Sequence, residues 1–205
     1  METRTKLLDA AVTIIRKQGF AATTVDQLCA AAGMTKGGFF HHFASKEAIG
    51  IAAAEHWVAL TEPLFAAADY HAHSNPLERV LSYLDLRESM IDGDTDAFSC
   101  LAGTLAQEVH QSYPTIARAA QEAIEGHARG LEADIADALA CHGAGDVDAH
   151  ALALHVQVVL QGAFVLAKAQ GATDSARASV RHLKNYIRLL CAGEIGSSAC
   201  DAPAR

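Results

Sequence analysis

The 205-residue chain contains four prolines and almost no alternation of β-branched residues. Aromatic residues make up 6% of the sequence, whereas alanine is very frequent. Small side chains favour closely packed helices, while sheets are enriched in bulky and branched ones. The composition therefore predicts an all-α protein. Hydrophobic residues account for 51% of the chain, which is enough to build a buried core.

Cysteine is sparse and irregularly placed. The cysteines are odd in number, and no C-x-x-C pair occurs among Cys29, Cys100, Cys141, Cys191 and Cys200. This pattern argues against a disulfide framework and against a zinc site. A basic-then-apolar leader is also lacking, so we expect a protein of the reducing cytoplasm. We expect neither a metal ion nor a cofactor.

The formal net charge of −8 is unusual for a DNA-binding protein, but the charge is unevenly distributed. Residues 1–48 carry six basic and four acidic side chains, a net charge of +2, whereas the remainder carries −10. A mildly basic N-terminal part and an acidic remainder suit a protein that binds the phosphates of a nucleic acid through its N-terminal part only.

Residues 24–43, TVDQLCAAAGMTKGGFFHHF, carry the local signals of two short helices joined by a tight turn. Thr24 and Gln27 form a capping-box pattern, and Gly33 can take the left-handed conformation that ends a helix. Thr35 can cap a second helix two residues later. Two helices joined by a turn containing glycine are the signature of a helix-turn-helix.

The second of these helices, Lys36 to about Phe43, has an unusual composition. Gly37 and Gly38 each weaken a helix by about 1 kcal/mol relative to alanine. Adjacent glycines let a backbone approach another molecule closely, because no side chain stands in the way. From these residues alone, a small core helix with flexible glycines is an equal alternative.

The run TKGGFFHHF over residues 35–43, followed by Ser45-Lys46-Glu47, resembles the DNA-binding domain of TetR-type (tetracycline-repressor-type) transcriptional regulators. The family pattern is glycine, any residue, an aliphatic or aromatic residue, tyrosine, a variable position, His or Tyr, Phe, and then Lys-Glu. The likeness covers residues 1 to about 50. One departure is Phe40, where the family usually has a tyrosine whose hydroxyl donates to a DNA phosphate. The resemblance implies that Phe40 would keep van der Waals contact with sugar or thymine methyl groups.

The resemblance implies a helix-turn-helix DNA-binding domain over residues 1–48 and a larger helical effector-binding and dimerisation domain over 49–195, with about nine helices in all. The short helix would enter the major groove, and a homodimer would set two copies about 34–36 Å apart on a near-palindromic operator in double-stranded DNA. Contacts with bases and phosphates are expected from Thr24, Thr35, Lys36, Gly37, Gly38, Phe40, His41 and Lys46. The tail 196–205 is small and polar, and we expect it to be disordered.

Apolar periodicity predicts further helices along the rest of the chain. Gly126 and Gly130, four residues apart, indicate a close helix crossing or a bend in the longest of them. The expected segments are Thr3–Lys17, Ser45 to about Ala68, Pro76 to about residue 91, Phe98–His110, Thr115 to about Ala140, Ala149–Ala167 and Ser175–Cys191.

Residues 149–167 contain no formal charge, and a run of this length raises the question of a membrane span. His150, His155 and Gln157 within it are poorly suited to lipid. We therefore expect a helix buried by its own domain and by a second subunit, with no membrane partner. In the family the last two helices form a four-helix bundle across a two-fold axis, which implies an interface at Gln161, Phe164, Lys168, Leu183 and Ile187.

The resemblance also implies a small-molecule effector site in the C-terminal domain, for which we select Trp57, Cys100 and Phe164. The run Cys100-Leu101-Ala102-Gly103 before Gln107-Glu108 resembles a family subgroup in which some members sense electrophiles through a cysteine. A thiolate at Cys100 would allow the same chemistry. The alternative is an inert buried thiol, since free cysteine is among the most buried residue types.

Three classes of function are compared on this basis. We favour a DNA-binding transcriptional repressor that a small-molecule effector releases from its operator, with thiol sensing through Cys100 as the alternative. The sequence has no nucleophile elbow, no phosphate loop, no HExxH and no convincing carboxylate pair, so we do not expect an enzyme. A helical protein-binding adaptor is the remote alternative, and such a protein has no use for glycines in the reading helix.

Overall fold

The computed structural model describes residues 2–144 and 146–193. Within these ranges the chain forms helices and no strand, which confirms the predicted all-α fold. The expectation of about nine helices omitted two short elements, the 3-10 helix η1 (Asp69–Ala72) and the helix α6 (Thr95–Phe98). The helices are α1 (Glu2–Gln18), α2 (Val25–Ala32), α3 (Lys36–His42), α4 (Lys46–Ala66), the 3-10 helix η1 (Asp69–Ala72), α5 (Pro76–Ser89), α6 (Thr95–Phe98), α7 (Leu101–Val109), α8 (Pro114–Cys141), α9 (Ala149–Gln170) and α10 (Asp174–Cys191).

The helix-turn-helix forms where the sequence predicts it, and the predicted caps explain why. The hydroxyl of Thr24 accepts a hydrogen bond from the amide of Gln27 at 3.2 Å, and the Gln27 side chain accepts one from the Thr24 amide at 2.8 Å. Gly33 has a φ of +66° and ends α2. Thr35 then accepts from the amide of Gly38 at 3.2 Å and begins α3. The two helices are therefore fixed locally, because side chains satisfy the free amides of their first turns.

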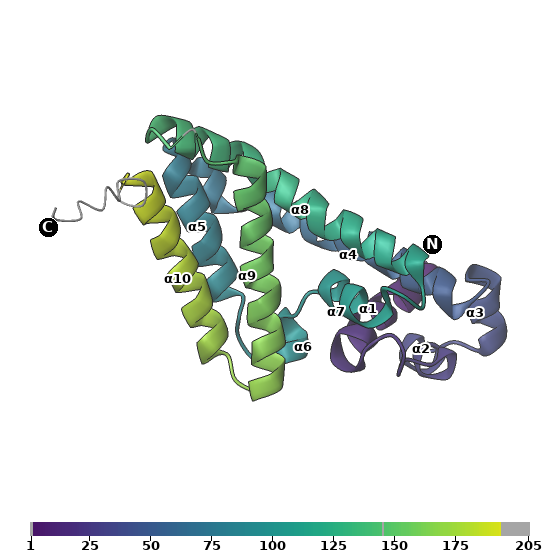
Figure 1. Ribbon diagram of the computed structural model, residues 1–205. Coiled ribbons are helices and arrows are strands. Elements are labelled where there is room, and N and C mark those ends of the chain that lie inside the picture. Colours follow the sequence, from purple (N-terminus) through teal and green to yellow (C-terminus); the bar gives the residue numbers. More distant parts are fainter. Residues whose placement is uncertain (1, 145, 194–205) are drawn as a thin grey trace, which may run out of the picture.

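The molecule has two hydrophobic cores, and α4 and α8 contribute side chains to both. Figure 1 shows these two long helices running from one group of helices to the other. The first core joins α1–α4 to α7 and to the start of α8, where Ile116 and Ala120 are buried. The second lies among α5, α8, α9 and α10. Helix α4 contributes Ile49 to the first core and Phe65 to the second. A shift of α4 would therefore change the packing in both cores. The expected tail 196–205 lies outside the described residues.

The helix expected over Phe98–His110 begins only at Leu101 and ends at Val109, and Phe98 instead ends the preceding helix α6. Helix α6 ends at Phe98, Ser99 is extended, and α7 begins at Leu101 with Cys100 as its N-cap. The Cys100 sulfur accepts from the amide of Gly103 at 3.5 Å. The break is also held from outside, because Arg16 of α1 donates to the Ser99 carbonyl at 2.7 Å. A contact between segments distant in sequence thus ends a helix that periodicity alone would continue.

Helix α9 is the one helix of the described residues whose length and composition would allow it to cross a membrane. In this structure it lies against α8 and α10, and eight of its side chains are buried in the chain. The largest of those inside are Leu152, Leu160 and Phe164, whereas Val158, Val165 and Leu166 are exposed on another side. One apolar face of α9 therefore packs in the second core, and another apolar face is exposed.

Candidate functional site

Helix α3 has an exposed polar face and an opposite face whose aromatic side chains pack in the first core. Phe39 and Phe43 are buried in the first core at 0% and 4% exposure. Lys36, Gly37 and His41 are exposed on the other side of the helix. Such a division is expected of a helix that packs on its own domain and offers its remaining face to another molecule.

The two glycines of α3 have different roles. A Cβ built on Gly37 would meet nothing nearer than the Thr35 hydroxyl at 3.8 Å, so its backbone is open to a neighbouring molecule. A Cβ on Gly38 would lie 2.9 Å from the terminal methyl of Met34. Gly38 therefore makes room for a side chain of its own domain. Phe40 is 55% exposed on the same short helix, next to this surface.

The sequence also predicts that Thr24, Thr35 and Lys46 contact DNA. Thr24 and Thr35 are exposed, and their hydroxyls are already used in capping. The Lys46 ammonium donates to the carbonyl of Ala21 at 3.0 Å and lies 4.5 Å from the centre of the Phe20 ring. Partial burial lowers the pKa of Lys46 from its ordinary value. It faces the α1–α2 turn in this structure.

Lys36 lies within 2.9 Å of Asp26 on α2. Both side chains are more than half exposed, and ion pairs of this kind contribute little to stability. Lys36 can therefore exchange the carboxylate for a phosphate at small cost.

A cavity of about 610 Å³ lies in the C-terminal part of the chain, and it brings together the three residues selected for an effector site. Trp57, Cys100 and Phe164 all line it, from α4, the start of α7 and α9. Gly126 and Gly130 of α8 also line it, and a Cβ on Gly130 would have no atom within 4 Å. These two glycines border the cavity and no other helix of the described residues crosses closely at them, so of the two alternatives only the bend stays a prediction.

The polar groups of the cavity were missed by the sequence analysis. The Tyr83 hydroxyl lies 2.8 Å from Nε2 of His127, and Nη1 of Arg87 lies 3.2 Å from the Tyr83 oxygen. Burial, with the Arg87 charge as the smaller cause, lowers the pKa of His127 to about 4. A signal was available, because Val80, Leu84 and Arg87 are spaced i, i+4, i+7. A charge in an apolar stripe marks a buried polar group.

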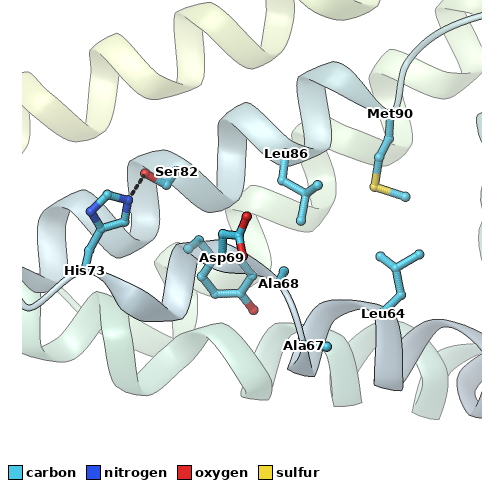
Figure 2. Close-up of a pocket in the computed structure, with 9 residues that line it drawn as sticks. Leu64, Ala67, Ala68, Asp69, His73, Ser82, Leu86 and Met90 are labelled. Atoms are coloured by element: carbon cyan, nitrogen blue, oxygen red, sulfur yellow. Dashed lines mark hydrogen bonds between the residues drawn. The ribbon is translucent and has the colours of Figure 1, made fainter.

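A second pocket, of about 440 Å³, opens between the end of α4, η1 and α5 (Figure 2). Leu64 and Met90 face one another across it, and the Ser82 hydroxyl lies 3.0 Å from His73 Nε2. Leu64, Tyr70 and Met90 also line the larger cavity. The two hollows are therefore neighbours that share a wall.

Comparison with known families identifies both parts of the chain. The sequence profile of "Bacterial regulatory proteins, tetR family" matches residues 7–53. A second profile, "Transcriptional regulator LmrA/YxaF-like, C-terminal domain", matches residues 76–182, more than half of the chain. The chain belongs to the TetR family of transcriptional regulators. The family resemblance predicted from the α3 sequence is thereby confirmed.

Individual relatives agree with this family assignment. The HTH-type transcriptional regulator YerO of Bacillus subtilis is 33% identical over 60 residues, which are 29% of this chain and 21% of YerO. The HTH-type transcriptional repressor NemR of Escherichia coli is 27% identical over 138 residues, 67% of each chain. The chain therefore spans about a fifth of YerO and two thirds of NemR in these alignments.

Solved structures show the same fold. The reduced form of E. coli NemR superimposes with a TM-score of 0.74 at 24% identity, over 90% of this chain and 97% of that one. The regulatory protein TetR from Rhodobacter sphaeroides superimposes with a TM-score of 0.79 at 23% identity, over 91% and 99%. At these identities the likeness concerns the fold.

The residues that the family resemblance assigned to a subunit interface lie mostly inside the chain. Phe164, Leu183 and Ile187 are 2–5% exposed and belong to the second core. Gln161 borders the cavity, and a Cβ on Gly103 would lie 1.9 Å from its amide oxygen. The Lys168 ammonium donates to the Arg16 carbonyl at 3.1 Å and so holds α9 to α1. Phe164, Leu183 and Ile187 therefore pack in the core of one chain, whereas Gln161 is half-buried and Lys168 is exposed, so their place in an interface stays a prediction.

Proposed function

We propose that this TetR-family protein is a homodimeric transcriptional repressor, which binds double-stranded DNA through α3 and leaves it when a small molecule occupies the cavity. The observation that carries this proposal is the exposed face of α3. It presents Lys36, the open backbone of Gly37 and His41, on a helix anchored by two buried phenylalanines. The relative NemR is a transcriptional repressor, which supports the same direction of regulation.

Each DNA contact follows from the chemistry of its side chain. Lys36 and His41 reach base edges or phosphates, and the Gly37 backbone comes close to the groove wall. Thr24 and Thr35 begin α2 and α3, whose first amides are positioned to bind phosphate. Lys46 contributes after it turns away from the Ala21 carbonyl, and Phe40 contributes apolar contact. Two copies about 34–36 Å apart then read the two halves of a near-palindromic operator.

The apolar face of α9 and α10 is the proposed dimer interface. Val158, Val165 and Leu166 are spaced i, i+7 and i+8 along α9, so they lie on one side of the helix. Tyr186 and Leu189 follow at i and i+3 on α10. Large apolar side chains gathered on one surface mark a site of association between proteins. A second copy of the chain covers this face.

Arg16 provides the route from the cavity to the DNA-binding unit. It belongs to α1, yet it lines the cavity and lies 4.7 Å from the centre of the Trp57 ring. Its guanidinium donates to the carbonyls of Ala97 and Ser99 at 2.7 Å each. An effector that displaces Trp57 or Ala97 therefore moves α1. Changing the ratio of binding and released states from 99:1 to 1:99 requires an affinity difference of about 5.5 kcal/mol between the states.

The test is a footprint on DNA flanking the protein's own gene, with affinities measured by gel shift. We expect Lys36→Ala and His41→Ala each to weaken operator binding at least tenfold. Arg129→Ala on the exposed side of α8 is the matched control and should leave binding unchanged. Equal affinities for all three variants and the wild type would favour the adaptor alternative.

Thiol sensing is a second candidate, favoured by the position of Cys100. Its sulfur caps α7, lines the cavity and accepts from the amide of Gly103. A helix N-terminus stabilises a thiolate, and the cavity gives an electrophile access to it. In this case N-ethylmaleimide releases the DNA from the wild type and leaves it bound to Cys100→Ser. Release from both proteins, or from neither, would rule the candidate out.

A further inference from the structure

The cavity contains an arginine that no carboxylate neutralises within the described residues. Arg87 lies on α5, whose neighbouring acids are already paired with α10. Asp85 is bound by Lys184, and Glu88 lies 2.7 Å from Arg181. The charge of Arg87 is therefore directed into the cavity without a partner of opposite sign.

Aromatic rings surround the Arg87 guanidinium. Its central carbon lies 5.2 Å from the centre of the Phe65 ring and 5.9 Å from that of Phe164. Its Nη1 atom lies 3.2 Å from the hydroxyl of Tyr83 and 3.1 Å from Nε2 of His127. A guanidinium has five N–H groups in a planar fork that matches a carboxylate. Most of these donors have no acceptor in the part of the chain that the structure describes.

Two further groups that line the cavity offer donors, the imidazole of His127 and the side-chain amide of Gln157. Because a guanidinium only donates, Nε2 of His127 must accept, which places the imidazole proton on Nδ1. The low pKa of His127 keeps the ring neutral at pH 7. The side-chain nitrogen of Gln157 is buried, lines the cavity and makes no hydrogen bond in the described structure. A buried donor without an acceptor is costly, so these groups favour a ligand rich in acceptor oxygens.

The walls of the cavity favour an apolar body for the same ligand. Trp57 and Phe65 line it from α4, Phe98 from α6 and Phe164 from α9. The acidic side chains that line it, Glu62 and Glu122, are exposed and so belong to its rim. A cationic ligand would meet the charge of Arg87 inside. A wholly apolar ligand would leave both the guanidinium and the Gln157 amide unpaired.

We propose that the cavity binds a small organic acid, with its carboxylate on Arg87 and its apolar body against Trp57 and Phe164. This inference rests on the proposed function, in which the cavity is the effector site. Gln157 and Nδ1 of His127 are then available to the second carboxylate oxygen or to another acceptor on the ligand. The charged, planar guanidinium of Arg87 favours the acid over a neutral molecule of the same shape.

Isothermal titration calorimetry with matched probes tests the proposal on the full chain. The probes are 2-naphthoate with 2-naphthamide and octanoate with octanamide, because each pair differs mainly in charge. In at least one pair the acid should bind the wild type tenfold or more tighter than its amide. Arg87→Gln should reduce that preference at least tenfold while the amide still binds, which shows that the cavity is intact. Arg87→Lys should keep part of the preference.

Arg118→Gln is the control, because Arg118 is exposed on α8 and should leave both affinities unchanged. The proposal is wrong if neither acid is preferred over its amide, or if Arg87→Gln keeps the full preference. Gel shifts separate it from the proposed function. Operator binding by the ligand-free protein without any binding of acids would overturn only the acid specificity. Acids that bind without weakening the DNA complex would overturn the effector role of the cavity.

Discussion

At the scale of single residues, His127 should make the folded state sensitive to acid. Its pKa is about 4 in the folded chain, against an ordinary value of 6.5. Above pH 6.5 the imidazole is neutral in both states, so it does not affect how stability varies with pH. As the pH falls from 6.5 towards 4, only the unfolded chain takes up the proton, and the free energy of unfolding decreases. At about 1.4 kcal/mol per pKa unit the loss is about 3 kcal/mol.

Urea unfolding at pH 7 and pH 4.5 measures this effect as a difference between variants. His127→Gln keeps a group that can accept from Tyr83 or Arg87 but does not titrate in this range. It should lose about 2–3 kcal/mol less than the wild type on acidification. His182→Gln changes an exposed histidine of α10 and should behave like the wild type. An equal loss in His127→Gln would contradict the burial argument.

At the scale of elements, Gly50 sets how closely α4 can approach its neighbours. A Cβ at this position would lie 2.7 Å from Cε2 of Phe20 and 2.8 Å from Cδ1 of Ile116. Both side chains are buried, so Gly50→Ala should destabilise the protein by about 1–3 kcal/mol through overpacking. This exceeds the gain in helix propensity, which is about 1 kcal/mol. Gly130→Ala, where no atom lies within 4 Å, should instead be stabilising in the same unfolding experiment.

Helix α6 should depend on Arg16, which belongs to a different part of the chain. A single helical turn is unstable by itself. Arg16 donates hydrogen bonds to the carbonyl of Ala97 in α6 and to the carbonyl of Ser99, the C-cap of α6. In Arg16→Met we expect hydrogen exchange of the Ala97 and Ser99 amides to accelerate at least tenfold. Lys17→Met, at the exposed neighbouring position, should leave exchange unchanged. Unaltered exchange in Arg16→Met would remove α6 from the proposed route between cavity and α1.

The elements that local chemistry determines could be predicted from the sequence. Thr24, Gly33, Thr35 and Ser45 act at the helix ends as expected, because a cap involves only residues within a few positions. The break at Ser99 was not predictable in this way. It depends on Arg16, 83 positions earlier in the chain.

The faces of α9 could not be assigned from its sequence for a related reason. A helix that is apolar on nearly all sides has weak periodicity, so the sequence does not indicate which side enters the core. Phe164 was therefore expected at an interface, although it packs inside the chain and borders the cavity. Trp57, Cys100 and Phe164, which the sequence suggested for an effector site, do line one cavity, and their role there stays a prediction. Arg87 and His127 were missed because their meeting requires α5 and α8 to be packed together.

At the scale of the whole molecule, the proposed interface on α9 and α10 would connect dimerisation to DNA binding. In the proposed dimer each α3 reads one half-site, so two copies are needed to bind both halves of an operator at once. Leu166 is 42% exposed on this face. Leu166→Glu would place a charge in the proposed interface without disturbing the core, so sedimentation should detect monomers.

Operator affinity should fall together with dimerisation, because each half-site must then be bound independently. We expect a loss of at least a hundredfold for Leu166→Glu in gel shifts at a protein concentration where the wild type is dimeric. Leu60→Glu is the matched control, since Leu60 is 48% exposed on α4, away from α9 and α10. It should sediment and bind DNA like the wild type. A Leu166→Glu protein that remains dimeric would place the two-fold axis elsewhere, and with it the spacing between the two copies of α3.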